Sequence, residues 1–202
     1  YNSKTGKFLG TIYGSDRYND RFVGEDEYQD ITSSANKSMK NDINEVVKNI
    51  KDQAAINSKT KEIMQQYADK MENSLGSVST PLKLNSDLGF LARIGFAEFR
   101  GSSSIVQQLG MDVVLNRVEA KNFPNTIEGV IKQKWQFSSL NEGDPNKPYY
   151  ENPYGQMYNS RGQFLTMNHN AWIKTVENAF SIKYNIVRGI SQGATLYYSP
   201  GS

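Results

Sequence analysis

Apolar residues recur at helical spacing over two stretches in the first part of the chain, residues 36–56 and residues 59–75. Spacings of three and four place these side chains on one stripe and predict two amphipathic helices. We interpret both stripes as core packing or helix pairing. In residues 1–14, strand-forming residues are interrupted by glycines, a pattern that predicts a small hairpin.

The segment GSVSTP, residues 76–81, is rich in turn-forming residues and has the composition of a linker. Aromatic, glycine and apolar residues are more frequent after residue 81 than before it. We therefore place a boundary near residue 80, between an N-terminal accessory region (1–80, a hairpin and two helices) and a compact domain (81–202).

The compact domain mixes helical patterns with one long stretch that lacks them. Residues 134–165 carry many Gly, Pro, Asn and Tyr residues and predict a β-hairpin or small β lobe. Residues 194–198 predict a final strand. The predicted class is α+β, mostly helical. The helices are expected at 85–99, 104–119, 126–133 and from Asn168 or Asn170 to Arg188.

Composition excludes several classes of chemistry. The 202 residues include no cysteine and one histidine, which rules out disulfides, thiolate nucleophiles and zinc sites built from several histidines. We expect no metal and no cofactor. A net charge of +2 is too balanced to indicate a nucleic-acid partner. No run approaches the roughly 20 apolar residues that span a bilayer, and no serine-hydrolase G-x-S-x-G motif occurs.

One acidic residue lies on an apolar helix face. Leu88, Leu91, Gly95 and Glu98 share one side of the helix expected over 85–99. A carboxylate on such a face is either paired or held protonated. The first alternative is a buried salt bridge or a helix cap. The second is a general acid, which glycosidic cleavage requires. The spacing leaves both open.

Four blocks around and after Glu98 resemble the SleB-like cell-wall hydrolase family, named for a spore-cortex-lytic enzyme. They are LARIGFAEFRG (91–101), VVLNRV (113–118), FPNTIEGVI (123–131) and QFSSLNEG (136–143). GATLYYSP (193–200) fits the closing strand of that family. The resemblance covers about half of the chain and leaves residues 1–85 unexplained.

This resemblance implies a lysozyme-like fold in which Glu98 is the single catalytic glutamate. It also implies cleavage of the β-1,4 bond between N-acetylmuramic acid and N-acetylglucosamine by a lytic transglycosylase mechanism. The family commonly has Ala where this chain has Phe99. We expect that bulk to narrow the cleft beside the acid or to deepen its desolvation.

Five further residues are candidates for contacting the glycan. Gln136, Phe137 and Ser138 stand where the chain enters the expected β lobe, which faces the catalytic helix in a lysozyme-like cleft. Tyr197 and Tyr198 alternate faces on the expected last strand, so one of them is expected to line the cleft. The alternative for Phe137 and its neighbours is an ordinary strand with Phe137 in the core.

The mechanism depends on whether a second carboxylate takes part. A hydrolase needs a base or nucleophile near the acid, whereas a transglycosylase uses the 6-hydroxyl of the substrate. Glu142, Asp144 and Glu151 are the nearby candidates, and we favour the single-acid mechanism. Asn116 and Arg117 are interpreted as structural, with Arg117 paired to an acid such as Asp112 or Glu119. His169 is interpreted as a cap or surface residue.

The opening YNSKTGKFLGT resembles a segment that precedes toxin modules in secreted bacterial proteins. It suggests an antibacterial effector, secreted or delivered to the periplasm or cell wall, with a neutralising immunity protein as partner. A phage lysin or a housekeeping wall enzyme shares the same catalytic domain. The alternatives of another class are an inactive lysozyme-like glycan-binding module and an adaptor that docks through residues 36–75.

Overall fold

The computed structural model describes residues 1–11 and 20–196 and divides into two compact units, Tyr1–Pro81 and the residues from Leu82 onward. Helices dominate, and the described residues form one small antiparallel sheet, which confirms the α+β, mostly helical class. None of the described helices has the length and apolar character needed to cross a membrane.

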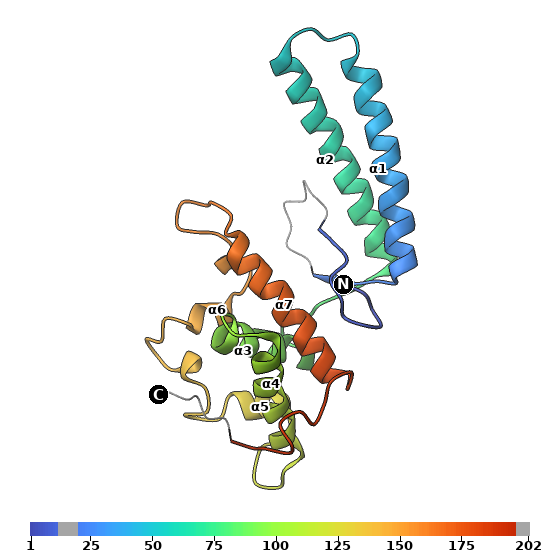
Figure 1. Cartoon of the computed structure of the whole chain (residues 1–202). Helices are drawn as coiled ribbons and strands as arrows, with labels where there is room; N and C mark the ends of the chain where they lie inside the picture. Colours follow the sequence, from blue (N-terminus) through green and yellow to red (C-terminus); the bar gives the residue numbers. More distant parts are fainter. Residues whose placement is uncertain (12–19, 197–202) are drawn as a thin grey trace. The chain divides into compact units, whose positions relative to one another are not determined.

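The first unit is a helical hairpin of α1 (Glu25–Val47) and α2 (Gln53–Val78), which lie side by side in Figure 1. Helix α1 begins well before the expected residue 36, because three acidic residues in its first turn favour a helix N-terminus where few apolar residues mark one. Helix α2 is capped by Asp52. Its buried residues are Ile63, Tyr67, Ala68, Met71 and Leu75.

Strand β1 (Arg21–Phe22) pairs antiparallel with β2 (Thr80–Pro81) at the base of this hairpin. The Arg21 guanidinium donates to Ser79 Oγ at 2.5 Å and to the carbonyl oxygens of Ser79 and Gly76. Residues 76–81 therefore complete α2 and form β2, and they are not the linker that their composition predicted.

The hairpin expected over residues 1–14 is not found in its described part, residues 1–11. Those residues form a closed loop in which the Asn2 N–H donates to the Lys7 carbonyl and the Gly6 N–H donates to the Asn2 carbonyl. Asn2 also pairs with Val23 in an isolated parallel bridge. The loop turns back at Gly6, which has a φ of 71°. Glycine adopts this left-handed conformation without strain.

The second unit packs around helix α3 (Asp87–Phe99), which buries ten of its thirteen residues. It contacts α4 (Ser104–Glu119), α5 (Ile127–Ile131), α6 (Lys147–Glu151) and α7 (Thr166–Lys183). The largest fully buried side chains of this core include Leu91, Ile94, Phe96, Met111, Trp172 and Ile182.

Side-chain caps set the starts of three of these helices. Ser86 caps α3, Ser103 caps α4 and Thr126 caps α5, each by accepting a backbone N–H three residues on. For α5 the cap residue, Thr126, is the first residue of the range expected for that helix, 126–133. His169 lies in the first turn of α7, with its ring 5.3 Å from that of Phe164.

The β lobe expected over residues 134–165 is absent, which corrects the prediction. This segment forms α6 and two 3₁₀ turns, η1 (Ser138–Leu140) and η2 (Gly155–Met157), and its one bridge joins Tyr158 to Phe164. Its prolines and glycines prevent a continuous ladder of strand hydrogen bonds. Residues 194–196 form no strand, and the remaining two positions of the expected strand lie outside the described residues.

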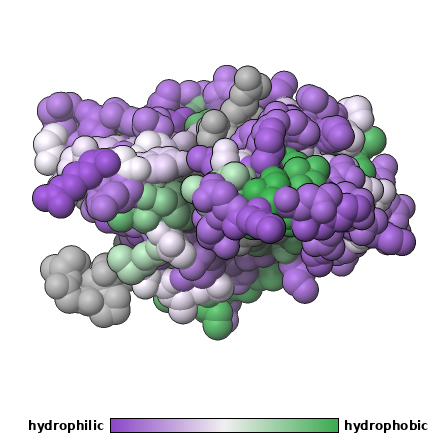
Figure 2. All heavy atoms as spheres, turned by 90° about the horizontal axis from the view of Figure 1, so that it is seen from above, coloured by the Kyte–Doolittle hydropathy of each residue, from purple (hydrophilic) through white to green (hydrophobic). Residues whose placement is uncertain are grey.

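The view in Figure 2 shows a largely hydrophilic surface interrupted by apolar patches. In the second unit, most exposed apolar side chains are aliphatic or stand beside another aromatic ring. Trp135 differs, because it is 75% exposed on a short connection between α5 and η1.

Candidate active site

Helix α3 presents Glu98 one residue before its C-terminal end, half-buried between the core and solvent. The backbone N–H of Ser139 donates to Oε1 of Glu98 at 2.8 Å, and the Ser138 hydroxyl approaches the same oxygen at 3.5 Å. Within residues 1–11 and 20–196, no cation lies close enough to Glu98 to form an ion pair. The structure thus brings Ser138 to Glu98, and it adds Ser139, which the sequence analysis did not single out.

The turn η1 reaches Glu98 because its flanking residues are anchored. Phe137 is buried, Ser139 is fully buried, and the residues between and before them, Ser138 and Gln136, are exposed. Phe137 therefore lies in the core, as the alternative interpretation expected, but it precedes a 3₁₀ turn and is not part of a strand. Within the described part of the chain Gln136 forms no hydrogen bond with Glu98, and Tyr197 and Tyr198 lie outside that part.

Phe99, the neighbour of Glu98, does not enter a cleft. Its side chain is 4% exposed and packs against Gly110 of α4, where an added Cβ would lie 2.4 Å from the ring. The glycine makes room for the bulk of the ring between α3 and α4. Phe99 therefore does not narrow a cleft, contrary to the expectation.

Arg93 of α3 and Arg100, which caps the C-terminal end of that helix, hold the segment around α6 in place. Arg100 donates to Asn146 Oδ1 at 2.8 Å and lies 3.7 Å from the centroid of the Tyr149 ring. Arg93 donates to the Tyr150 carbonyl at 2.6 Å and lies 4.1 Å from the centroid of the Tyr150 ring. Both guanidinium groups thus contact α6 or its N-cap residue, and neither forms an ion pair with Glu98, which stands between the two arginines in the sequence.

The tyrosines of this segment serve the core more than an open surface. Tyr150 is buried, and burial raises the pKa of its hydroxyl. Tyr149 packs edge-on against Phe96 and under Arg100, and Tyr154 packs against Trp172. The aromatic richness that suggested a sugar platform here is largely a packing feature.

The three candidate second carboxylates are engaged elsewhere. Lys147 binds Glu142 at 2.6 Å, holding the pKa of Glu142 below its usual range, and lies 3.9 Å from Glu151. Asp144 accepts the backbone N–H of Asn146 at 2.8 Å. In the described part of the chain none of the three contacts Glu98.

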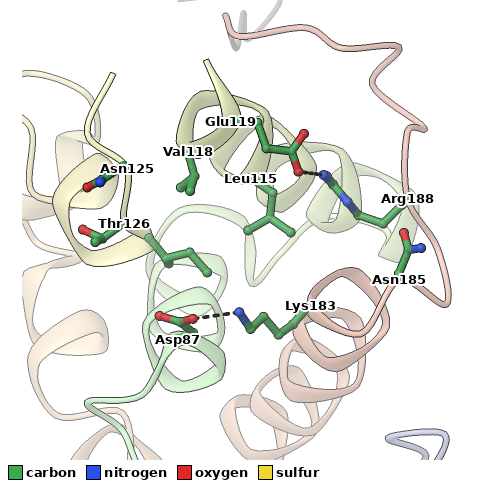
Figure 3. A pocket seen from close by; sticks show the side chains of 10 residues that line it. Asp87, Leu115, Val118, Glu119, Asn125, Thr126, Lys183, Asn185 and Arg188 are labelled. Atoms are coloured by element: carbon green, nitrogen blue, oxygen red, sulfur yellow. Dashed lines mark hydrogen bonds and ion pairs between the residues drawn. The ribbon is translucent and has the colours of Figure 1, made fainter. Parts of the chain in front are cut away.

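A cavity of about 520 Å³ lies at the other end of α3, near Asp87 (Figure 3). Asp87 and Glu98 are eleven positions apart in the sequence, or about 16 Å along a helix. The charged groups of the cavity are paired with each other, Asp87 with Lys183 and Glu119 with Arg188, both at 2.7 Å. None of the residues that line it is a candidate from the sequence.

The described residues contain no cluster of three or more His, Asp or Glu side chains that would hold a metal ion. The arrangement at Glu98 is instead that of a lone acid, oriented by main chain. Oε1 of Glu98 accepts both of these hydrogen bonds. No described residue forms a hydrogen bond with Oε2.

Residues 106–202 match the model of the cell wall hydrolase family. The match covers slightly less than half of the chain and begins eight residues after Glu98, so the proposed acid lies outside it. No curated protein and no solved structure matches the chain. The cell wall hydrolase match supports a general role in hydrolysing peptidoglycan.

A buried acid organises the end of the segment that matches the cell wall hydrolase family. Asp112 of α4 is fully buried, forms an ion pair with Arg188, and accepts hydrogen bonds from the backbone N–H and hydroxyl of Ser191. Burial alone would raise the pKa of Asp112, but the bonds from Ser191 and Arg188 outweigh it and hold that pKa below its ordinary value.

Asn116 and Arg117, in the VVLNRV block, also fasten this segment. Asn116 donates to Ser191 Oγ and to the Ala194 carbonyl, both at 2.8 Å. Arg117 donates to the Thr195 carbonyl at 2.7 Å and forms no ion pair with Asp112 or Glu119. Both residues are structural, as interpreted, although the partner of Arg117 differs from the expected acid.

Proposed function

We propose that the unit beginning at Leu82 cleaves the β-1,4 bond between N-acetylmuramic acid and N-acetylglucosamine in peptidoglycan, with Glu98 as the general acid. The observation that carries the proposal is the environment of the Glu98 carboxyl group, which is half-buried and, among the described residues, pairs with no cation and accepts hydrogen bonds only at Oε1. The cell wall hydrolase match supports the substrate class.

The proposed reaction uses the two carboxyl oxygens of Glu98 differently. Oε1 accepts the N–H of Ser139, and Oε2 delivers the proton to the substrate. That proton passes to the glycosidic oxygen as the bond to C1 of N-acetylmuramic acid breaks, and N-acetylglucosamine leaves with a free 4-hydroxyl.

The same carboxylate then completes the reaction. It takes the proton of the 6-hydroxyl of the muramic residue, whose oxygen bonds to C1 and closes a 1,6-anhydro ring. Glu98 returns to its protonated form and no water is consumed. The engagement of Glu142 and Glu151 by Lys147 supports this single-acid mechanism over one that needs a second carboxylate.

The test is digestion of purified sacculi by the wild-type protein and by Glu98→Gln, followed by turbidity and by mass spectrometry of the products. Anhydro products are one water lighter than products with reducing ends. Lysis by the wild type alone, with anhydro products, is expected. Equal lysis by both proteins removes Glu98 from the acid role, and binding without lysis by either one indicates an inactive glycan-binding module.

The substrate sets the compartment in this proposal, because peptidoglycan lies in the bacterial periplasm or cell wall. We therefore propose that the protein acts there after secretion or delivery. The proposals of an effector role and of an immunity protein rest on the opening residues alone. They are tested by targeting the protein to the periplasm of a bacterial strain and measuring whether a co-expressed immunity protein relieves the toxicity.

A further inference from the structure

Trp135 occupies an unusual position three residues before Ser138. Its φ is 68°, in the left-handed region, and its side chain is 75% exposed. The left-handed conformation strains a bulky residue and persists only where the surroundings impose it. Exposure also forgoes the stabilisation that a buried indole provides. Neither feature stabilises the fold.

The surroundings impose this conformation through two buried anchors. Val130, in α5, is fully buried, and Phe137 is buried at the start of η1. Between them the Gln133 N–H donates to the Val130 carbonyl at 3.3 Å, and the Gln136 N–H donates to the Gln133 carbonyl at 3.2 Å. The chain therefore turns sharply, and Trp135 lies on the turn with its ring in solvent.

The other aromatic rings of this unit do not share that position. Trp172 is fully buried against Phe96 and Tyr154. Among the exposed rings, Tyr158 and Phe164 pack on each other. In the described part of the chain Trp135 has no aromatic neighbour, and its one ring contact is the Lys134 ammonium, 5.2 Å from the centroid.

We propose that the indole of Trp135 is a stacking platform for a pyranose ring of a β-1,4-linked N-acetylhexosamine strand bound beside Glu98. One face of a pyranose presents C–H groups, which suit the negative face of an aromatic ring. The exposed polar side chains next to it, Lys134 and Gln136, supply hydrogen-bond partners for hydroxyl and acetamido groups.

The chain keeps this platform within reach of the acid. Three residues span at most about 11 Å, so Trp135 stays near Ser138, whose hydroxyl approaches Glu98. A strand bound across Glu98 thus extends onto the indole by a sugar unit or two. The inference rests on the proposed function for the identity of the glycan, but its readout is binding and not cleavage.

The experiment titrates a soluble β-1,4 N-acetylglucosamine oligomer into the full chain carrying Glu98→Gln, with tryptophan fluorescence as the readout. Trp135 and Trp172 are the chain's two tryptophans, and only Trp135 is exposed. The oligomer is expected to shift the emission to shorter wavelength and to protect it from a soluble quencher. Trp135→Gly, added to Glu98→Gln, is expected to abolish that signal.

Affinity is measured separately by calorimetry, where Trp135→Gly is expected to weaken binding about tenfold. Glycine adopts a φ of 68° without strain, so this variant should melt at or above the temperature of its parent. Trp135→Phe is expected to restore part of the affinity, because it returns a flat ring. Tyr184→Ser, which removes another exposed ring, is the matched control and is expected to bind normally.

Equal affinity with and without Trp135, or fluorescence that does not respond to the oligomer, overturns the platform. If the fluorescence does not respond to the oligomer, the exposed ring of Trp135 is a contact site for another protein and not for a sugar. These outcomes are separable from failure of the proposed function, which shows as lysis of sacculi by Glu98→Gln whether or not Trp135 binds sugar.

Discussion

The backbone N–H of Ser139 donates to Oε1 of Glu98 across 2.8 Å and so joins η1 to the C-terminal end of α3. A main-chain donor fixes the carboxyl group whatever the side chain at position 139. The hydroxyl of Ser139 is itself buried and has no hydrogen-bond partner among the residues that the structure describes. A substitution of the Ser139 side chain should therefore leave the position of the Glu98 carboxyl group unchanged.

Glu98→Gln is expected to keep the fold and to lose lysis. The amide is nearly isosteric with the acid but has no transferable proton, and a general acid contributes about 10²–10⁴ in rate. Turbidity loss of purified sacculi measures the rate, and circular dichroism checks the fold. Glu128→Gln, a second helical glutamate of the same unit, is the matched control and should lyse at the wild-type rate. More than a tenth of wild-type activity in Glu98→Gln contradicts the assignment.

Ser139→Ala is expected to leave lysis unchanged and to raise the free energy of unfolding by up to about 1 kcal/mol. The change removes a desolvated hydroxyl without a partner, and it keeps the N–H that donates to Glu98. Urea denaturation and the sacculus assay are the two measurements. A large loss of activity at unchanged stability means that the hydroxyl itself meets the substrate.

Single substitutions Glu142→Gln, Asp144→Asn and Glu151→Gln are each expected to retain most of the activity. Lys147 and a local turn engage these carboxylates away from Glu98, and the single-acid mechanism requires none of them. The rate is measured on sacculi and the products by mass spectrometry. If one variant is as inactive as Glu98→Gln and wild-type products carry reducing ends, the enzyme is a two-carboxylate hydrolase.

Asp112→Asn is expected to destabilise the second unit by about 3 kcal/mol at neutral pH. The substitution removes the buried carboxylate with which Arg188 forms an ion pair. The pKa of Asp112 is lowered in the folded state. Its contribution is therefore complete above the unfolded value of about 3.9 and is lost as the pH falls through the folded pKa.

Chemical denaturation between neutral and acid pH measures both effects of Asp112→Asn. The variant should lose part of the decline in stability that the wild type shows below about pH 4. Asp87→Asn is the matched control, since Asp87 pairs with Lys183 at the surface, where such pairs contribute about 0–1 kcal/mol. Equal destabilisation by both variants contradicts the buried role of Asp112.

Lysis is expected to continue in excess EDTA. The chain has no cysteine and one histidine, and the proposed reaction moves a proton between Glu98 and the substrate without a metal. The measurement is the initial lysis rate before and after chelation and dialysis. Loss of activity that zinc restores shows that the chemistry is different.

The sequence by itself determined helices α3, α4 and α5 of the second unit, because their caps and apolar spacing are local. Ser86, Ser103 and Thr126 begin helices at or near the expected residues. It also marked Glu98 as an acid on an apolar face. It did not determine residues 134–165, where glycines, prolines and tyrosines are equally common in strands and in irregular turns, and where contacts of Arg93 and Arg100 select the turns.

Only the tertiary structure decided what surrounds the candidate acid. Ser139 is 41 residues from Glu98 in the sequence, and its donor is a backbone group that no residue type reveals. The direction of the Phe99 ring was set by Gly110 of another helix, and the partner of Asp112 was set by the path of the chain after α7. Local propensity specifies elements, whereas long-range packing specifies which polar groups meet, because such contacts depend on how the elements are brought together.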